Sequence, residues 1–293
     1  MSRTLPFTKM HGAGNDFVVL DGLREDLPPL EPLVRRLADR HFGIGFDQLL
    51  VVRDSSSADF RMEIFNADGS QVEMCANGIR CFFAYLRDAG HTGAEQVRVE
   101  TLSGVVVPRW AGPGQVTVDM GPPVLAPAKI PTRLGDPAGS GPVLDAPLSV
   151  EGETLAVSCV SMGNPHAVTY VADVDAAPVT RLGPAIENHS AFPNRVNVEF
   201  VEILDRGRVR QRTWERGTGE TLACGSGACA TVVASILRGV VDDSVTVVLR
   251  GGEAGRAAAG GDPSEAAEGG DPSVWMTGPA TTVFQGQLEI EEG

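Results

Sequence analysis

The sequence of 293 residues predicts an α/β protein of the α+β type, built from two pseudo-symmetric lobes. Three observations support this fold class. Short strand-like runs are mixed with a few helical stripes, and one segment is repeated at a fixed offset. The chain is also too long for one small module, and it suits two domains of medium size.

Three segments carry apolar residues at the spacing of an amphipathic helix. The first spans Leu30–Leu37, with prolines in its first turn, where they are tolerated. The second spans Ile79–Leu86 and ends at Gly90, and the third spans Ala230–Leu237 and ends at Gly239. We therefore expect three helices.

Alternating or β-branched runs between these segments predict strands. The runs are Val97–Glu100, Val105–Val107, Val116–Met120, Arg195–Ile203 and Val245–Leu249.

Two stretches predict irregular structure. Gly135–Pro142 is rich in glycine and proline, and we expect a surface loop there. Residues 251–273 contain no Val, Ile, Leu, Met or aromatic side chain, so they predict a disordered or mobile surface insertion outside any core.

An internal repeat relates the two halves of the chain. Residues 60–86 align without a gap with residues 209–235, at an offset of 149. We expect a first lobe of residues 1–119 plus 276–293, a second of residues 120–275, and an active site in the cleft between them. The matched pairs are Cys75 with Cys224, Gly78 with Gly227, Phe65 with Trp214, Asn66 with Glu215, Asn15 with Asn164, and Gln48 with Asn197.

Composition excludes several classes of function. The 24 Lys+Arg against 38 Asp+Glu give a net charge of −14, which argues against a nucleic-acid surface. There is no apolar stretch of membrane-spanning length and no signal-peptide segment at the start, so we expect a cytoplasmic protein. Five cysteines are an odd number and too few for a secreted disulfide framework.

Cys75 and Cys224 each follow a polar, glycine-rich loop and open a helix. At a helix N-terminus the backbone N–H groups and the dipole lower the pKa of a thiol. A thiolate that faces a thiol across a bound carbon can invert a stereocentre, because one removes a proton and the other returns one. The backbone N–H groups that could bind a substrate carboxylate belong to Ala76, Asn77, Gly225 and Ser226.

Other roles for the cysteines remain open. Core packing suits Cys81, Cys159 and Cys229. A zinc site would need ligand spacing that is absent here, and we expect no metal. A cysteine hydrolase would need a histidine such as His166 as its base. A catalytically inactive binding protein is a fourth interpretation, which the two helix-opening cysteines disfavour.

Amide and charged side chains cluster near the repeated segments and predict a polar pocket for a small zwitterion. Arg216 could bind a second carboxylate, and Glu215 could accept from an ammonium group. The set comprises Asn15, Gln48, Asn66, Asn77, Asn164, Asn197, Glu215 and Arg216.

The sequence resembles diaminopimelate epimerase. The motifs that carry the resemblance span nearly the whole chain in order: His11–Phe17, Gly43–Gln48, Phe65–Ser70, Ser161–His166, Arg195–Asn197 and Glu215–Gly227.

The resemblance implies a cofactor-independent epimerase that interconverts LL- and meso-diaminopimelate for lysine and peptidoglycan synthesis. It further implies a homodimer, and lobes that each wrap a curled, mainly antiparallel sheet around a central helix. By motif, Cys75 and Cys224 are the acid/base pair and His166 a supporting residue. The implied substrate contacts are Asn15, Gln48, Asn66, Ala76, Asn77, Asn164, Asn197, Glu215, Arg216, Gly225 and Ser226.

Two features depart from the family pattern. Ala76 stands where the family usually has glycine, which preserves the backbone N–H donor if the position is helical. Residues 251–273 stand where the family usually has a short apolar strand. A related racemase acting on proline or hydroxyproline is the alternative enzyme, and Arg216 favours diaminopimelate because it suits a distal carboxylate.

Overall fold

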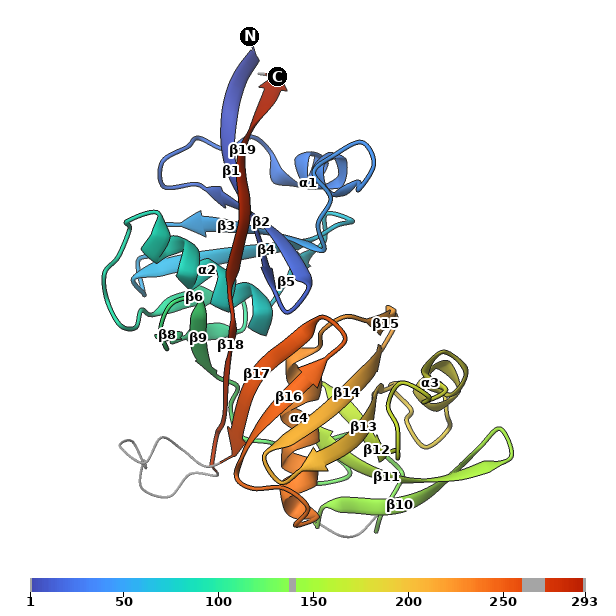
Figure 1. Ribbon diagram of the computed structural model, residues 1–293. Coiled ribbons are helices and arrows are strands. Elements are labelled where there is room, and N and C mark those ends of the chain that lie inside the picture. The colour runs from blue at the N-terminus through green and yellow to red at the C-terminus, as the bar shows by residue number, and fades with distance from the viewer. Residues whose placement is uncertain (1, 137–140, 260–271, 292–293) are drawn as a thin grey trace. The chain divides into compact units, whose positions relative to one another are not determined.

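The computed structural model describes residues 2–136, 141–259 and 272–291 (Figure 1). The chain forms two compact units, one of Met1–Val118 with Thr277–Gly293 and one of Asp119–Met276. Each unit consists mostly of strands with two helices, which confirms the predicted fold class. Within the described ranges, no helix has both the length and the apolar character needed to span a membrane.

The first unit is built on a sheet with the strand order β19-β1-β2-β3-β4-β6-β7, and β5 pairs with β4. Neighbouring strands are antiparallel except for β2 with β3 and β4 with β6. The bounds are β1 (Ser2–Gly12), β2 (Asn15–Asp21), β3 (Gln48–Arg53), β4 (Phe60–Asn66), β5 (Gln71–Val72), β6 (Val99–Thr101), β7 (Gly104–Val106) and β19 (Thr281–Glu291), followed in this unit by β8 (Arg109–Trp110) and β9 (Gln115–Asp119).

Two helices cover opposite faces of this sheet (Figure 1). Helix α1 (Leu30–Ala38) packs Val34 against Leu49 and Val51 of β3. Because side chains alternate along a strand, Leu50 points to the other face, towards helix α2 (Ala76–Asp88). Burial of these apolar side chains stabilises the unit by about 2 kcal/mol per residue.

The second unit has the strand order β10-β11-β12-β13-β14-β16-β17-β18, with β15 paired to β14. Helices α3 (Val179–Glu187) and α4 (Gly225–Leu237) pack on opposite faces of its sheet. The bounds are β10 (Val143–Val150), β11 (Glu153–Ser161), β12 (Pro165–Tyr170), β13 (Asn197–Asp205), β14 (Arg208–Glu215), β15 (Gly219–Thr221), β16 (Ser244–Leu249), β17 (Gly252–Ala259) and β18 (Val274–Pro279), the last of which carries the chain back into the first unit.

The two units repeat one another at the predicted offset of 149. Residues 30–38 of α1 correspond to residues 179–187 of α3, and residues 76–88 of α2 to residues 225–237 of α4. Strand pairing repeats as well, because β2 and β12 each run parallel to the next strand, which is β3 or β13. The prediction of two similar lobes is confirmed.

Helix α3 is absent from the sequence-based expectation. Gly183 and Pro184 lie inside it, and both residues are unfavourable in helix interiors. A Cβ on Gly183 would lie 2.6 Å from Cγ of Trp214, so only a glycine at this position leaves room for the indole ring. Packing against the tryptophan therefore outweighs the low helix propensity.

The prediction that residues 251–273 contribute nothing to a core is wrong for the first part of the segment. Strand β17 pairs antiparallel with β16, and Ala257 is buried in the cluster around α4. The hydrogen bonds of a strand come from its backbone, so an alanine-rich sequence can form one. Where the helix packs close to the strand, an alanine side chain is large enough to fill the space between them. Residues 260–271 of this segment and residues 137–140 of the Gly135–Pro142 stretch lie outside the described residues.

Candidate active site

Cys75 is the residue immediately before the first turn of α2. Its backbone is extended, with φ −142°, and Sγ accepts a hydrogen bond from the backbone N–H of Gly78 at 3.3 Å. The thiol thus caps one of the donors that every helix leaves free at its N-terminus. Ala76 is the first helical residue, so the departure from the usual glycine keeps the backbone N–H donor.

Amides surround this helix end. Asn15 Oδ1 lies 3.9 Å from Cys75 Sγ and accepts from Asn77 Nδ2 at 3.1 Å. Asn77 in turn accepts from Nη2 of Arg80, whose side chain is fully buried in α2. Asn15 is thereby held against Cys75.

A second set of contacts holds Asn15 from the loop before β3. Asp47 Oδ2 accepts from Asn15 Nδ2 at 2.8 Å, and Arg40 bridges Asp47 and Asp16. Burial alone would raise the pKa of Asp16, but hydrogen bonds from Arg40 and Lys9 outweigh it and lower that pKa to about 2. Asp16 is therefore a carboxylate at neutral pH.

Gln48 and Asn66 lie at the same edge of the sheet, because β3 begins where β4 ends. They are direct partners across the two strands, and Gln48 Nε2 donates to Asn66 Oδ1 at 3.0 Å. Asn66 Nδ2 donates to Ser70 Oγ at 3.1 Å.

Cys224 occupies the corresponding position before α4. Its backbone is extended, with φ −126°, and Sγ lies 3.6 Å from Ser226 Oγ. Burial raises the pKa of this thiol well above its ordinary value, and the carboxylates of Glu215 and Glu199 raise it further. The expectation that the helix N-terminus lowers the thiol pKa is wrong for Cys224, because burial and two nearby carboxylates outweigh the hydrogen bonds from Ser226 and from the backbone N–H of Gly227.

Asn164, Asn197 and Glu215 gather at one edge of the second sheet, where β12 and β13 begin and β14 ends. Asn197 Oδ1 accepts from the backbone N–H of Arg216 at 2.8 Å. Thr221 Oγ1 donates to Glu215 Oε1 at 2.5 Å, and burial raises the pKa of Glu215. The exposed Arg216 donates from Nη1 to the carbonyl oxygen of Asn194 at 3.1 Å.

Sequence reasoning missed Glu199. This side chain is fully buried on β13, and Oε1 lies 2.8 Å from His166 Nδ1, while Nε2 of the same ring lies 2.9 Å from Asn164 Oδ1. The repeat carries the missed signal, because residue 199 corresponds to Leu50 at the offset of 149. The carboxylate of Glu199 thus stands in the second repeat where the first has the apolar core residue Leu50.

The predicted site residues fall into two groups, one in each unit, and each group includes a cysteine at the N-terminus of a helix. The first group is Asn15, Gln48, Asn66, Cys75, Ala76 and Asn77, and the second is Asn164, His166, Asn197, Glu215, Arg216, Cys224, Gly225 and Ser226. Each offers a thiol, backbone N–H donors and side-chain amides, which together can bind a carboxylate and move a proton.

The other three cysteines are core residues, as predicted. Cys81, Cys159 and Cys229 are fully buried, and burial raises the pKa values of Cys81 and Cys159 to about 12. Among the described residues, no three or more His, Cys, Asp or Glu side chains are arranged to hold a metal ion.

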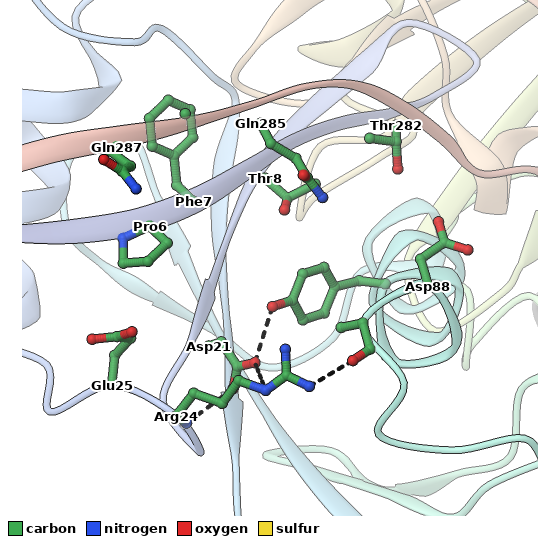
Figure 2. A pocket seen from close by; sticks show the side chains of 13 residues that line it. Pro6, Phe7, Thr8, Asp21, Arg24, Glu25, Asp88, Thr282, Gln285 and Gln287 are labelled. Carbon is green, nitrogen blue, oxygen red and sulfur yellow. Dashed lines mark hydrogen bonds and ion pairs between the residues drawn. The ribbon is translucent and has the colours of Figure 1, made fainter.

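A cavity of 570 Å³ lies elsewhere in the first unit (Figure 2). Asp21 and Arg24 form an ion pair in its wall, and Tyr85 OH donates to Asp21 Oδ2 at 3.0 Å. Of the described residues that line this cavity, none belongs to the predicted site.

Comparison with known proteins gives consistent matches. The family described as diaminopimelate epimerase matches residues 7–126 and 158–283. The diaminopimelate epimerase of Aromatoleum aromaticum is 52% identical over 290 residues, covering 98% of this chain and 100% of the relative. That of Laribacter hongkongensis is 53% identical over 290 residues, covering 98% and 99%.

Solved structures share the fold at low sequence identity. A PhzF-family phenazine biosynthesis protein of Bacillus anthracis has a TM-score of 0.68 at 18% identity, covering 98% of this chain and 100% of its own. A hydroxyproline epimerase of Agrobacterium vitis has a TM-score of 0.65 at 18% identity, covering 99% and 94%.

Proposed function

Because the chain belongs to the diaminopimelate epimerase family, we propose that Cys75 and Cys224 are the two acid/base groups with which it interconverts LL- and meso-diaminopimelate. The family makes the protein an isomerase of lysine biosynthesis. The observation that carries the assignment is the pair of cysteines, each placed before the helix of one repeat.

The reaction removes a proton from one face of the α-carbon and adds a proton to the opposite face. One cysteine, as thiolate, takes the α-proton, so the C–H bond breaks and its electron pair stays on carbon. The other, as thiol, gives its proton to the opposite face, and its sulfur keeps the S–H electrons. The two cysteines end with their protonation states exchanged, and the reverse reaction uses them in the opposite roles.

Backbone N–H groups at the two helix ends stabilise the carbanion. Ala76 and Asn77 begin α2, and Gly225 and Ser226 begin α4, so their N–H groups have no helical acceptor. We assign these four donors to the α-carboxylate, which gains charge as the proton leaves. The helix dipoles add to this stabilisation.

The remaining polar residues recognise the distal amino-acid group. We assign Arg216 to the distal carboxylate, since a guanidinium binds a carboxylate through two parallel hydrogen bonds. Glu215 accepts from an ammonium group, and the side-chain amides complete the pocket: Asn15, Gln48, Asn66, Asn164 and Asn197. His166 supports Asn164 through its Nε2 contact.

The decisive experiment incubates the protein with LL-diaminopimelate in deuterated water without added cofactor. We expect inversion with one α-deuterium per turnover. Cys75→Ala and Cys224→Ala should each reduce inversion at least about 1000-fold, because each face needs its own group. Cys81→Ala is the matched control, a core cysteine whose replacement should leave the chemistry intact.

Three results would refute the proposal. Absence of exchange at every pH from about 6 to 9 would exclude the reaction. Wild-type turnover in either Cys75→Ala or Cys224→Ala would exclude the two-base assignment. Faster inversion of proline or hydroxyproline would make the protein the alternative racemase.

We further propose a cytoplasmic homodimer that associates through strand β19. This strand is at the edge of the first sheet, and Val283 and Phe284 are about half exposed. An exposed apolar edge strand favours pairing with a second copy. Val283→Lys should convert the dimer to a monomer in sedimentation analysis, whereas Leu102→Lys, at another exposed apolar side chain, should not. A wild-type monomer at micromolar concentration would exclude the dimer.

A further inference from the structure

The two helices that follow the cysteines rest on different surfaces. Six buried apolar residues of α2 and of the strands beneath it correspond to buried polar residues of α4 and its strands. At the offset of 149 the pairs are Phe17 with His166, Leu50 with Glu199, Met62 with Gln211, Ile64 with Thr213, Phe82 with Thr231, and Leu86 with Ser235. At these six positions the repeat keeps the same backbone structure but differs in side-chain polarity.

Glu199 is the charged member of this polar set, and it lies directly under the first turn of α4. A Cβ placed on Gly227 would lie 2.6 Å from Glu199 Oε1 and 3.2 Å from Cys224 Sγ. The carboxylate and the sulfur therefore flank the same small residue. At Gly78, the equivalent position, the neighbouring atom is a methyl group of Leu50 at 3.2 Å.

Only one of the two oxygens of the Glu199 carboxylate has a hydrogen-bond partner among the described residues. Glu199 Oε1 lies 2.8 Å from His166 Nδ1, whereas Oε2 is buried and has no hydrogen-bond partner within the described ranges. A buried carboxylate that lacks a full set of donors projects its negative charge strongly onto its neighbours.

Two further titratable groups face this end of α4. Glu215 on β14 adds a second carboxylate, and His166 on β12 can offset part of the charge. The first turn of α4 contains no acidic residue, and Ser226 is its polar contact with the sulfur. Negative charge therefore predominates around Cys224.

We propose that Glu199 is a positioning residue of the reaction, which keeps Cys224 protonated in the resting protein and so makes the two cysteines chemically unequal. The inference rests on the proposed function, in which Cys224 is one of the two acid/base groups. Through Nδ1 of His166, Glu199 also fixes the ring that contacts Asn164. The first unit has Leu50 at the equivalent position and so lacks this carboxylate.

The test measures alkylation by iodoacetamide between about pH 6 and pH 10, with Cys224 and Cys75 quantified separately by mass spectrometry. In the wild type, the midpoint for Cys224 should lie above about 8.5, the value of an ordinary thiol. Glu199→Gln keeps the size and the contact to His166 but removes the charge. It should lower the Cys224 midpoint by about one unit and raise its alkylation rate at pH 8 up to about 10-fold.

The controls separate charge from structure. Glu202→Gln makes the same change on the same strand, at a residue that forms an ion pair with Arg210. It should leave the pH profile of Cys224 alkylation unchanged. Glu199→Asp retains the charge and should keep the midpoint high. The Cys75 profile serves as an internal reference in every variant.

Either of two results would overturn the inference. One is a Cys224 profile that is the same in Glu199→Gln and the wild type, or that shifts equally in Glu202→Gln. The other, independent of any variant's folding, is a wild-type Cys224 midpoint at or below that of an ordinary thiol. Failure of the two-base assignment would instead appear as inversion by Cys224→Ala, which the alkylation experiment does not measure.

Discussion

Gly78 and Gly227 occupy the same position in the two repeats, and their surroundings predict different tolerance of a methyl group. Gly→Ala in a helix stabilises by about 1 kcal/mol when space permits. The added Cβ at position 227 would meet the buried Glu199 carboxylate at 2.6 Å, and at position 78 a methyl group at 3.2 Å. We expect Gly227→Ala to lower the free energy of unfolding by about 2 kcal/mol.

Urea denaturation of both variants checks this prediction. Gly78→Ala is the matched control and should remain within about 0.5 kcal/mol of the wild type, since the gain in propensity offsets the tighter contact. Equal unfolding free energies for the two variants would contradict the geometry of Glu199.

The lowered pKa of Asp16 predicts that this residue contributes to the free energy of unfolding in a pH-dependent way. Its pKa is about 2 in the folded protein and 3.8 as the ordinary value, so the ionised carboxylate stabilises the fold above about pH 4. This contribution disappears as the pH falls through about 2. Asp16→Asn should lower the free energy of unfolding by about 2 kcal/mol at pH 7, and the difference from the wild type should shrink between pH 4 and pH 2.

The measurement is urea unfolding at a series of pH values, with Asp243→Asn, at an exposed aspartate of the second unit, as the control. A difference between wild type and Asp16→Asn that stays constant down to pH 2 would show that the contacts with Arg40 and Lys9 do not stabilise the carboxylate.

At the scale of elements, strand β17 shows what an alanine-rich sequence can contribute. Ala257 is 1% exposed in the cluster around α4, while the neighbouring Ala258 is half-buried and points to the other face. We expect Ala257→Asp to destabilise the second unit by at least about 3 kcal/mol, because it buries a carboxylate among apolar side chains.

Ala258→Asp is the matched substitution one residue along and should change the melting temperature by a few degrees at most. Similar losses of stability in both variants would mean that the side chains of β17 do not alternate between a face towards α4 and a face away from it.

The sequence predicted three of the four helices in the described residues, because their apolar stripes are regular and two of them end at glycine. It missed α3, where Gly183 and Pro184 lower the local propensity and the tryptophan that compensates lies in a distant strand. Both cysteines and their flanking amides were predicted by motif and repeat. Glu199 was not, because a glutamate on a predicted strand is ordinarily a solvent-facing residue, and the signal lay only in its correspondence to Leu50 in the repeat.

At the scale of the whole molecule, the first unit depends on the end of the chain. Strand β19 pairs with β1 along nearly its entire length, from Ser2 with Glu291 to His11 with Thr281 (Figure 1). In the second unit, the equivalent partner of β11 is β10, which is adjacent in sequence. The sequence-based expectation placed residues 276–293 in the first lobe, but no local pattern indicates that they pair with β1.

Truncation after Ala280 should therefore unfold the first unit selectively. It removes the strand that pairs with β1 and covers its buried residues Leu5 and Phe7. Hydrogen exchange should show loss of protection in residues 2–118 and retained protection in residues 119–276. Truncation after Glu291 is the control and should change neither unit, and equal loss in both units would contradict their independence.

The pairing of β1 with β19 also sets the order in which the chain can be completed on the ribosome. The described strands of the second unit have all been synthesised once residue 279 has emerged, whereas β1 pairs only after β19 has been synthesised. The unit that is synthesised first is thus completed last. The same pairing brings Ser2 beside Glu291, so a short linker can join the two ends of the chain. A circular permutant opened between Val118 and Asp119 would then make each unit one continuous stretch of chain.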